Sequence, residues 1–314
     1  MKKLRYILCL VILSLFGAKA QQLPQYTQFM LNEMAINPAV AGREDYTDVR
    51  SNNRYQWVGI TDAPRTYMLT ANGPIKSKNM GVGMHLYTDI VGPTRRTGLN
   101  FAYAYHLKVD EETFVSLGLS AGILQWGIDG SKLILHDEGD ANLLTSYRTK
   151  IVPDFGTGVY FYKKNRFYFG VAVPQIYQAP INIYVDRQSN SKIVRHLNIN
   201  GAYKFDIGDD FKVEPSFIMK YAKPAPLVVD LAVRGIYQEQ VWLGIGYRSW
   251  IVNGVNSEAL TAMVGYMYKD YLMFGYSYDF CTTNIKKYST GTHEVMLGLR
   301  FSKKQASTWE AKKQ

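Results

Sequence analysis

The sequence predicts an all-β protein, a transmembrane up-and-down antiparallel β-barrel of about fourteen strands. Apolar residues alternate with small or polar ones from Met80 onward, which is the pattern of strands with two different faces. Most of these segments run for about ten to fourteen residues, whereas strands of soluble sheets usually have about five or six. Tight and long connections also tend to alternate along the chain, as they do in outer-membrane barrels.

The first twenty residues have the organisation of a secretory signal peptide. Lys2, Lys3 and Arg5 precede an apolar run over 6–16, and Ala18-Lys19-Ala20 forms a small-residue cleavage site. An apolar run of about eleven residues is too short for a membrane-spanning helix, which needs about twenty. We therefore expect the segment to be cleaved from the mature chain, and no cysteine follows it to carry a lipid anchor.

The charge balance changes once this segment is removed. The chain has 36 basic and 26 acidic side chains, and 32 basic ones remain without the segment. They are scattered through turns with no dense basic run, so the composition does not indicate a nucleic-acid partner. Only Cys281 remains of the two cysteines, so an intramolecular disulfide is not expected.

Residues 21–45 differ from the rest of the chain. Tyr26, Phe29 and Met30 recur at three-to-four spacing, and the pattern ends at Asn37-Pro38, which predicts a short amphipathic helix. Such a segment could plug the lumen of a fourteen-stranded barrel. That lumen is wider than the interior of an eight-stranded barrel, which side chains alone can fill. It could also contact periplasmic partners, or form a loosely ordered leader. These side chains are the candidates for the first two roles.

The barrel itself is expected over residues 46–302. In one representative segment, Leu99, Phe101 and Tyr103 alternate with Asn100 and Ala102. The fourteen segments with this pattern are 47–57, 65–74, 79–89, 95–108, 113–127, 153–163, 166–176, 193–206, 211–222, 226–237, 240–251, 257–268, 271–280 and 292–302. Closure into a barrel is expected because lipid cannot satisfy an exposed sheet edge.

The connections predict the orientation. Those after the fourth, sixth, eighth, tenth and twelfth strands are tight, whereas long ones cover 128–152, 177–192 and 281–291. Long loops face the cell exterior in outer-membrane barrels, which places both termini in the periplasm, with 303–314 as a periplasmic tail. The last strand ends at the aromatic Phe301, as in bacterial outer-membrane barrels.

A soluble, exported β-sandwich is the alternative fold. Its apolar faces would pack on one another rather than on lipid. Such a fold would need neither an even strand count nor alternating short and long connections. The 24 tyrosines also favour the barrel, because aromatic side chains gather at both membrane interfaces.

The sequence contains no catalytic constellation and predicts no enzyme. The five histidines lie far apart and form no zinc signature, and no nucleophile elbow, phosphate-binding loop or dinucleotide fingerprint occurs. We expect no catalytic residue, no metal and no cofactor. The acidic loop over 129–140 raises the question of calcium, but it lacks the EF-hand spacing, and a solvated loop is the preferred interpretation.

Charged residues also fall on the inward face of the predicted strands. Asp230, Arg234, Arg248 and Arg300 alternate with lipid-facing apolar residues. They could line a polar channel or pair with one another inside the barrel. The pattern leaves both possibilities open.

Three stretches near the start of the mature chain resemble a known family. They are Gln25-Tyr26-Thr27-Gln28-Phe29-Met30-Leu31-Asn32, then Asn37-Pro38-Ala39-Val40-Ala41-Gly42, then Arg54-Tyr55-Gln56-Trp57 before Pro64-Arg65-Thr66. In these residues and in layout the chain resembles the PorP/SprF family of the Bacteroidetes. The resemblance implies an outer-membrane barrel of the type IX secretion system, whose SprF-like branch serves the surface delivery and attachment of adhesins, including those used in gliding.

The resemblance implies a non-enzymatic role in the outer membrane. The barrel would contact membrane lipid, periplasmic components of the secretion system, and secreted cargo or the C-terminal domain of an adhesin. We expect the long loops to bind this partner through Tyr147, Tyr177, Tyr184 and Tyr288, because aromatic side chains are enriched in protein interfaces. The alternative function is a porin or channel for small or hydrophobic solutes.

Overall fold

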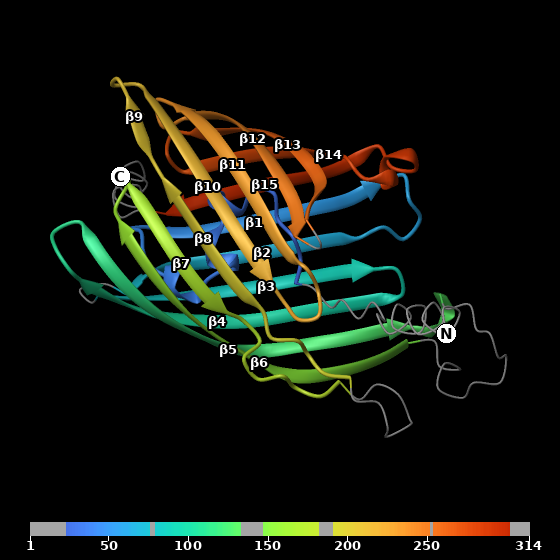
Figure 1. The fold of residues 1–314 in the computed structure, drawn as a ribbon. Helices are drawn as coiled ribbons and strands as arrows, with labels where there is room; N and C mark the ends of the chain where they lie inside the picture. Colours follow the sequence, from blue (N-terminus) through green and yellow to red (C-terminus); the bar gives the residue numbers. More distant parts are fainter. Residues whose placement is uncertain (1–22, 76–78, 133–146, 182–190, 252–253, 302–314) are drawn as a thin grey trace, which may run out of the picture.

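The computed structural model describes residues 23–75, 79–132, 147–181, 191–251 and 254–301. These ranges form a closed antiparallel β-barrel with a short N-terminal segment ahead of its first strand (Figure 1). Each strand pairs with its neighbour in sequence, and the last strand returns to the first, with Thr47 opposite Phe301. The predicted fold class is therefore confirmed.

The barrel has fourteen strands, although one of them is interrupted. The strand segments are β1 Thr47–Val58, β2 Arg65–Ile75, β3 Met80–Val91, β4 Thr94–Lys108, β5 Thr113–Asp129, β6 Tyr147–Lys163, β7 Phe167–Val173, β8 Leu197–Tyr203, β9 Phe205–Ile207, β10 Phe211–Tyr221, β11 Leu227–Tyr237, β12 Val241–Ile251, β13 Val255–Tyr268, β14 Leu272–Cys281 and β15 Gly291–Phe301. Both β8 and β9 pair with β10, so they are two parts of one strand.

The interruption falls at Lys204. Residues of β10 pair with β8 on one side of Pro215 and with β9 on the other, and Pro215 itself pairs with neither of these two strands. Proline has no backbone N–H to donate, which favours a local break in strand pairing. The N–H of Lys204 instead donates to the carbonyl of Arg166 on the other side, at 2.7 Å.

The two ends of the barrel differ, and we call them the turn end and the loop end. The turn end carries the start of β1, the end of β15 and the tight connections 109–112, 164–166, 208–210, 238–240 and 269–271. The loop end carries the connections after β1, β3, β5, β7, β10, β12 and β14, with short 3-10 turns at Gly130–Lys132 and Asn284–Lys287. The tight turns thus lie where the sequence predicts them.

Three strand boundaries at the loop end differ from the prediction by three or more residues. β6 begins at Tyr147 rather than 153, because Tyr147 continues the ladder opposite Asp129 at the end of β5. β7 ends at Val173, before Pro174, which cannot donate to a ladder. β8 begins at Leu197 rather than 193.

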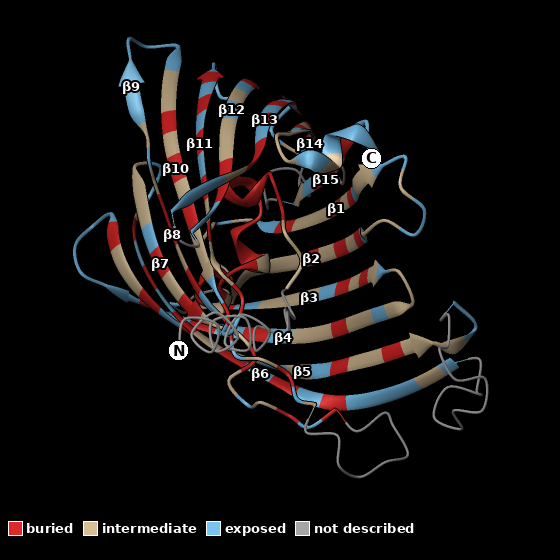
Figure 2. Cartoon of the chain, turned by 45° about the vertical axis from the view of Figure 1, so that its right-hand side comes forward, coloured by how far each residue is buried: buried red, intermediate tan, exposed pale blue. Residues whose placement is uncertain are grey.

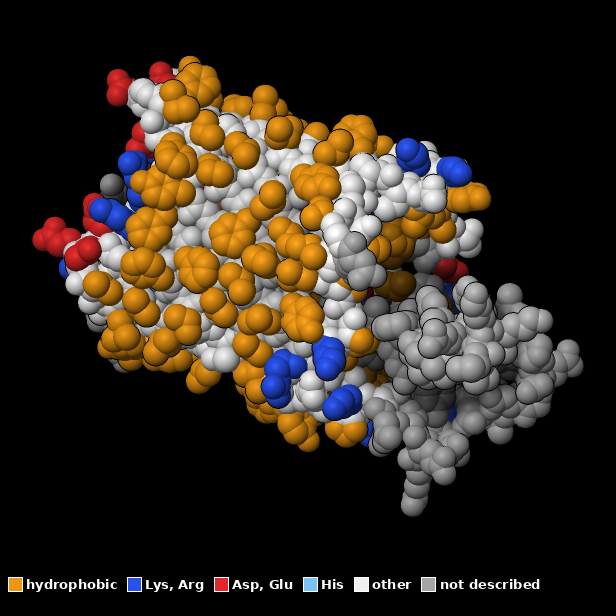
Figure 3. Space-filling model, in the orientation of Figure 1, with side chains coloured by type: hydrophobic (Ala, Val, Ile, Leu, Met, Phe, Trp, Pro, Cys, Tyr) orange, Lys and Arg blue, Asp and Glu red, His pale blue; other side chains and the backbone are white. Residues whose placement is uncertain are grey.

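The strands separate an apolar outer wall from a lumen lined by small and polar side chains. On β12, Leu243 and Ile245 are 64% and 69% exposed, whereas Trp242 and Arg248 on the other face are buried. Hydrophobic side chains cover the middle of the visible face, and most of the visible acidic side chains, with some basic ones, lie at the turn end, on the left (Figure 3). Among the described residues, no helix has the length and hydropathy to cross a membrane.

The N-terminal segment is not the expected amphipathic helix. It forms three 3-10 turns, η1 Phe29–Leu31, η2 Glu33–Ala35 and η3 Pro38–Val40. Residues at three-to-four spacing share a face in either helix type, so the pattern alone did not distinguish them. Pro38 starts the last turn, and the side chain of Asn37 caps it by accepting a hydrogen bond from Ala39 N at 2.9 Å.

Candidate functional site

The candidate functional site is the lumen, which residues 23–45 cross from one end to the other. The chain enters at the loop end, where Leu23 N donates to His196 Nε2 at 3.1 Å, just before β8. It leaves at the turn end, where Arg43 precedes the first strand. The buried course of this segment between the walls is red in Figure 2. We call it the lumen segment. The prediction that both ends of the mature chain lie at the turn end is therefore wrong for Leu23, because the lumen segment crosses the barrel before the first strand begins.

A network of charges holds the lumen segment at Thr27. Arg54 Nη2 lies 2.8 Å from Asp279 Oδ2, and Arg54 Nη1 lies 3.2 Å from Glu294 Oε2. Arg248 Nη1 adds a contact of 3.2 Å to Asp279 Oδ2. Thr27 Oγ1 accepts from Arg54 Nη1 at 2.7 Å and donates to Asp279, and Thr27 N donates to Glu294 Oε2 at 2.8 Å. All five residues are buried, so each charge depends on its partners.

The structure also decides between the two interpretations of the inward-facing charges. Arg248 Nε lies 2.5 Å from Asp230 Oδ1, and Arg234 Nη2 lies 2.7 Å from Glu214 Oε1. These groups therefore pair with one another across the lumen wall. Arg300 is the exception, since it forms no ion pair within the part of the chain that the structure describes, and its guanidinium stacks 4.9 Å from the ring of Tyr46.

Apolar side chains hold the middle of the lumen segment. Phe29, Met30 and Leu31 belong to one buried cluster with inward-facing residues of β10 to β15. The wall members of this cluster are Ile218, Ala232, Ile236, Trp242, Met263, Met267, Met273 and Met296. Burial of this apolar surface stabilises the segment inside the barrel.

A second polar cluster fixes the lumen segment near the turn end. Arg43 Nη1 lies 2.7 Å from Glu33 Oε2 and 2.8 Å from Tyr160 Oη, and Tyr160 also donates to Glu33. Burial raises the pKa of Glu33 from its ordinary value, although the neighbouring Arg43 opposes that shift. The cluster links the middle and the last part of the segment to β6.

Glycines on the inner wall allow the lumen segment to lie directly on the strands. A Cβ atom at Gly118 of β5 would overlap Ala39, and one at Gly158 of β6 would overlap Asn37. Asn37 Nδ2 donates to the backbone carbonyls of Val159 and Val171 at 3.0 and 3.3 Å, so it ties the segment to β6 and β7. Small wall residues and segment residues therefore fit as one packed interior.

The predicted N-terminal site residues all lie in the lumen. Tyr26, Phe29, Met30 and Asn37 are buried, and Pro38 is partly buried. Their side chains contact the inner wall rather than the outside of the barrel at either end. They come together in the structure as one continuous segment.

The predicted loop tyrosines are not brought together. Tyr177 and Tyr288 are 54% and 74% exposed on different connections of the loop end. Tyr147 is the first residue of β6, and Tyr184 lies outside the described residues. No ring contact joins the three that are described. The loop considered for calcium also lies mostly outside the described residues, and within the described ranges no group of three potential metal ligands occurs.

No sequence pattern points directly to the network around Thr27. Arg54, Asp279 and Glu294 do lie on inward positions of predicted strands, where a charge must find an opposite charge or water. Their inward positions are the feature of the sequence that indicates that these charges need partners. It does not identify the partners, because β1, β14 and β15 meet only when the barrel closes.

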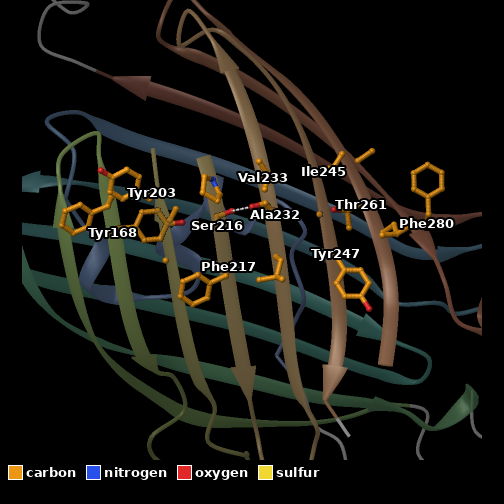
Figure 4. Close-up of a pocket in the computed structure, with 18 residues that line it drawn as sticks. Tyr168, Tyr203, Ser216, Phe217, Ala232, Val233, Ile245, Tyr247, Thr261 and Phe280 are labelled. Carbon is orange, nitrogen blue, oxygen red and sulfur yellow. Dashed lines mark hydrogen bonds between the residues drawn. The ribbon is translucent and has the colours of Figure 1, made fainter. Parts of the chain in front are cut away.

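An apolar groove of about 1050 Å³ lies on the outer wall across β7 to β14. Figure 4 shows Tyr203, Phe217, Val233, Ile245 and Phe280 among the side chains that line it. Its floor is formed by small residues such as Ala232 and Gly246. The groove continues the exposed apolar wall, so its natural covering is membrane lipid.

Solved structures share this fold at low sequence identity. The toluene transporter TbuX of Ralstonia pickettii is 9% identical with a TM-score of 0.52, over 88% of this chain and 94% of that one. The monoaromatic hydrocarbon channel CymD is 12% identical with a TM-score of 0.50, over 88% and 93%. At such identities the likeness concerns the fold alone.

The sequence also matches a family model over most of its length. The family is described as type IX secretion system membrane protein PorP/SprF, and the match covers residues 18–299. No curated protein matches the chain. The family match includes both the lumen segment and nearly the whole barrel.

Proposed function

Because this chain belongs to the PorP/SprF family of type IX secretion system membrane proteins, we propose that it helps to export secreted proteins or to attach them at the cell surface. The fold and the family are those of an outer-membrane barrel component rather than of an enzyme. The finer proposal is that its cargo includes adhesins, among them those used in gliding by Bacteroidetes cells. In this role the barrel is an anchor and docking platform.

The filled lumen is the observation that carries this proposal. The lumen segment is fixed by buried ion pairs at Thr27, by apolar packing at Phe29 and by the cluster at Glu33. A polypeptide in transit would need to displace all three. The occupied lumen therefore supports a role in which cargo is held by the ends of the barrel instead of passing through it.

The loop end is the proposed cargo-binding side. Long loops of outer-membrane barrels face the exterior, and here they carry the exposed rings of Tyr177 and Tyr288. Tyr147 at the start of β6 and Tyr184 complete the proposed contact set. The turn end then faces the periplasm, where other components of the secretion system would bind, and the tail 303–314 would lie there too.

The proposal includes cleavage of residues 1–20 as a signal peptide during export. Under this proposal residues 21–45 act as a plug, and 46–302 form the membrane-embedded barrel. The family match begins at residue 18, next to the proposed cleavage site. Sequencing the amino terminus of the protein isolated from outer membranes tests the cleavage directly.

A channel for small or hydrophobic solutes is the second candidate. It is supported by the fold shared with a toluene transporter and a monoaromatic hydrocarbon channel, although the identities are only 9% and 12%. Such a channel needs a continuous path for its solute. The two candidates therefore differ in whether the purified barrel conducts.

The test combines surface display with electrical recording. Deletion of residues 130–146, which connect β5 to β6, or replacement of Tyr177 and Tyr288 by alanine, should lower the amount of cargo on intact cells while the barrel remains in the outer membrane. The purified wild-type barrel should be silent in planar bilayers and should co-purify with a large secreted protein. A steady open channel together with unchanged cargo display in these variants would favour the solute channel.

A further inference from the structure

A second cavity opens at the turn end, and we call it the vestibule. It has a volume of about 410 Å³, within the range of about 300 to 1000 Å³ that is usual for ligand sites. Met30 and Leu31 of the lumen segment form part of its floor together with Trp242, Met267 and Met273. The vestibule is therefore the space left beneath the lumen segment on the proposed periplasmic side.

The wall of the vestibule holds buried hydrogen-bond donors with no acceptor. Trp242 Nε1, Arg234 Nε and Arg300 Nε are buried atoms that make no hydrogen bond in the described structure. Trp242 and Arg234 are only 4% and 7% exposed. An indole N–H and a guanidinium N–H can donate but cannot accept. An occupant that satisfies them must therefore supply acceptor oxygens.

The charges around the vestibule favour an anion. Eight basic and six acidic side chains line it. Most of the charges are paired, as Glu33 is with Arg43 and Glu214 with Arg234, so what favours an anion is the excess of two basic side chains. Arg300 has no ion pair among the described residues, and it is held in place by stacking on Tyr46 at 4.9 Å. It is thus a cation in the wall of the cavity with no carboxylate in ion-pair contact, and Glu44 of the same wall is the acid close enough to interact with it electrostatically.

The surroundings distinguish a peptide from a lipid. Neighbouring strands pair around the whole barrel apart from the interruption at Lys204, and there Lys204 N still donates to the carbonyl of Arg166, so a lipid headgroup has no open lateral path from the membrane into the lumen. The rim of the vestibule is formed instead by exposed residues of the turns, among them Lys164, Glu239 and Asp270. A polar rim around an apolar floor is the usual anatomy of a protein-binding site.

We propose that the vestibule binds an acidic peptide segment of a periplasmic partner, with a carboxylate at Arg300, Arg234 and Trp242 and an apolar side chain on the methionine-rich floor. The periplasmic location of the partner rests on the orientation in the proposed function. The chemistry of the site does not, because it follows from the unpartnered donors and the apolar floor. Arginine suits this role, since it binds carboxylates through parallel hydrogen bonds.

The test uses the purified full-length barrel and a fluorescein-labelled, end-blocked hexapeptide that alternates aspartate and leucine. A neutral peptide that alternates asparagine and leucine is the matched probe. Anisotropy should show saturable binding of the acidic peptide, about tenfold weaker in Arg300→Gln because a hydrogen bond to a charged group is lost. Trp242→Phe, which keeps an aromatic side chain but removes the indole N–H and part of the ring system, should also weaken binding. Arg95→Gln, at the exposed loop end, should bind like the wild type.

Three results would overturn the proposal. The neutral peptide could bind as tightly as the acidic one, or Arg300→Gln could bind like the wild type. Sodium acetate at equal carboxylate concentration could displace the peptide fully, which would make the vestibule a site for small anions only. None of these three results depends on the surface display of cargo. The peptide titration tests the vestibule and the display assay tests the proposed function, so one can fail while the other succeeds.

Discussion

Thr27 and Glu294 lie 267 positions apart in the sequence and meet inside the barrel, where the backbone N–H of Thr27 donates to Glu294 Oε2 at 2.8 Å. Glu294 belongs to the last strand, which also pairs with the first. The lumen segment can therefore reach its final position only when the barrel is closed or closing. This couples the filling of the lumen to completion of the sheet.

Replacing Glu294 by alanine should release this part of the lumen segment. The carboxylate accepts hydrogen bonds from Thr27 N and Gln28 N and pairs with Arg54. Its loss leaves the buried N–H groups of Thr27 and Gln28 without an acceptor, at a cost of about 1–3 kcal/mol for each unsatisfied group, and leaves Arg54 with Asp279 as its carboxylate partner. We expect brief channel openings in planar bilayers, where the wild type is silent.

The matched control is Glu239→Ala at the turn end. Glu239 pairs with Lys212 in an exposed position, where ion pairs contribute only about 0–1 kcal/mol. This variant should remain silent. Silent recordings from Glu294→Ala, with an unchanged unfolding midpoint, would show that the network does not hold the segment.

Gly118→Val should displace the lumen segment by steric overlap. A Cβ at this position would meet the backbone of Pro38 and Ala39, which cannot move aside as the end of a flexible side chain can. Overpacking of this kind costs about 1–3 kcal/mol. Trypsin should then cut the detergent-solubilised barrel after Arg43, which is held by Glu33 and Tyr160 in the wild type.

Gly235→Val provides the comparison for this variant. Gly235 lies on the outer wall, and its nearest neighbour to a new Cβ is the carbonyl of Leu243 at 3.9 Å. This substitution should leave Arg43 protected from trypsin. Equal protection in both valine variants would mean that the wall tolerates a side chain at Gly118.

Most of the barrel could be predicted from the sequence because a strand in a membrane must keep one face apolar. The segment predicted at 211–222 is Phe211–Tyr221, and that predicted at 226–237 is Leu227–Tyr237. A shift by one residue would turn every apolar side chain of such a strand into the lumen. The alternation of apolar and polar residues therefore predicts both where each strand lies and which of its faces points to the lipid.

The errors arose where this constraint is absent. The start of β6 at Tyr147 was missed because Arg148, Thr149 and Lys150 show no apolar alternation, although their backbone continues the ladder with β5. In the lumen segment, the spacing of Tyr26, Phe29 and Met30 fits an α-helix and a series of 3-10 turns equally well. Which one forms depends on wall contacts from distant strands.

The amino-terminal end of the lumen segment should be accessible from outside the cell. Leu23 lies at the loop end beside His196, the end proposed to face the exterior. An epitope inserted between Gln22 and Leu23 should therefore label on intact cells. An epitope after Gln314 should label only after the outer membrane is permeabilised. The opposite labelling pattern would show that the barrel has the reverse orientation in the membrane, because the two epitopes mark its two opposite ends.

A charge in the middle of the outer wall should destabilise the barrel in a depth-dependent way. Ile245 is 69% exposed in the centre of β12, so lipid would cover it. Ile245→Arg should lower the free energy of unfolding by about 2–4 kcal/mol, as expected near the bilayer midplane, measured by urea titration in lipid vesicles.

Val255 provides the matched control, because it is equally exposed, at 70%, but begins β13 at the loop end. Val255→Arg should cost only about 0–1 kcal/mol, as expected near the interface. Equal losses for the two variants would contradict a membrane that spans the central apolar wall, since burial in lipid is the only difference in environment that separates two outward-facing sites of similar exposure.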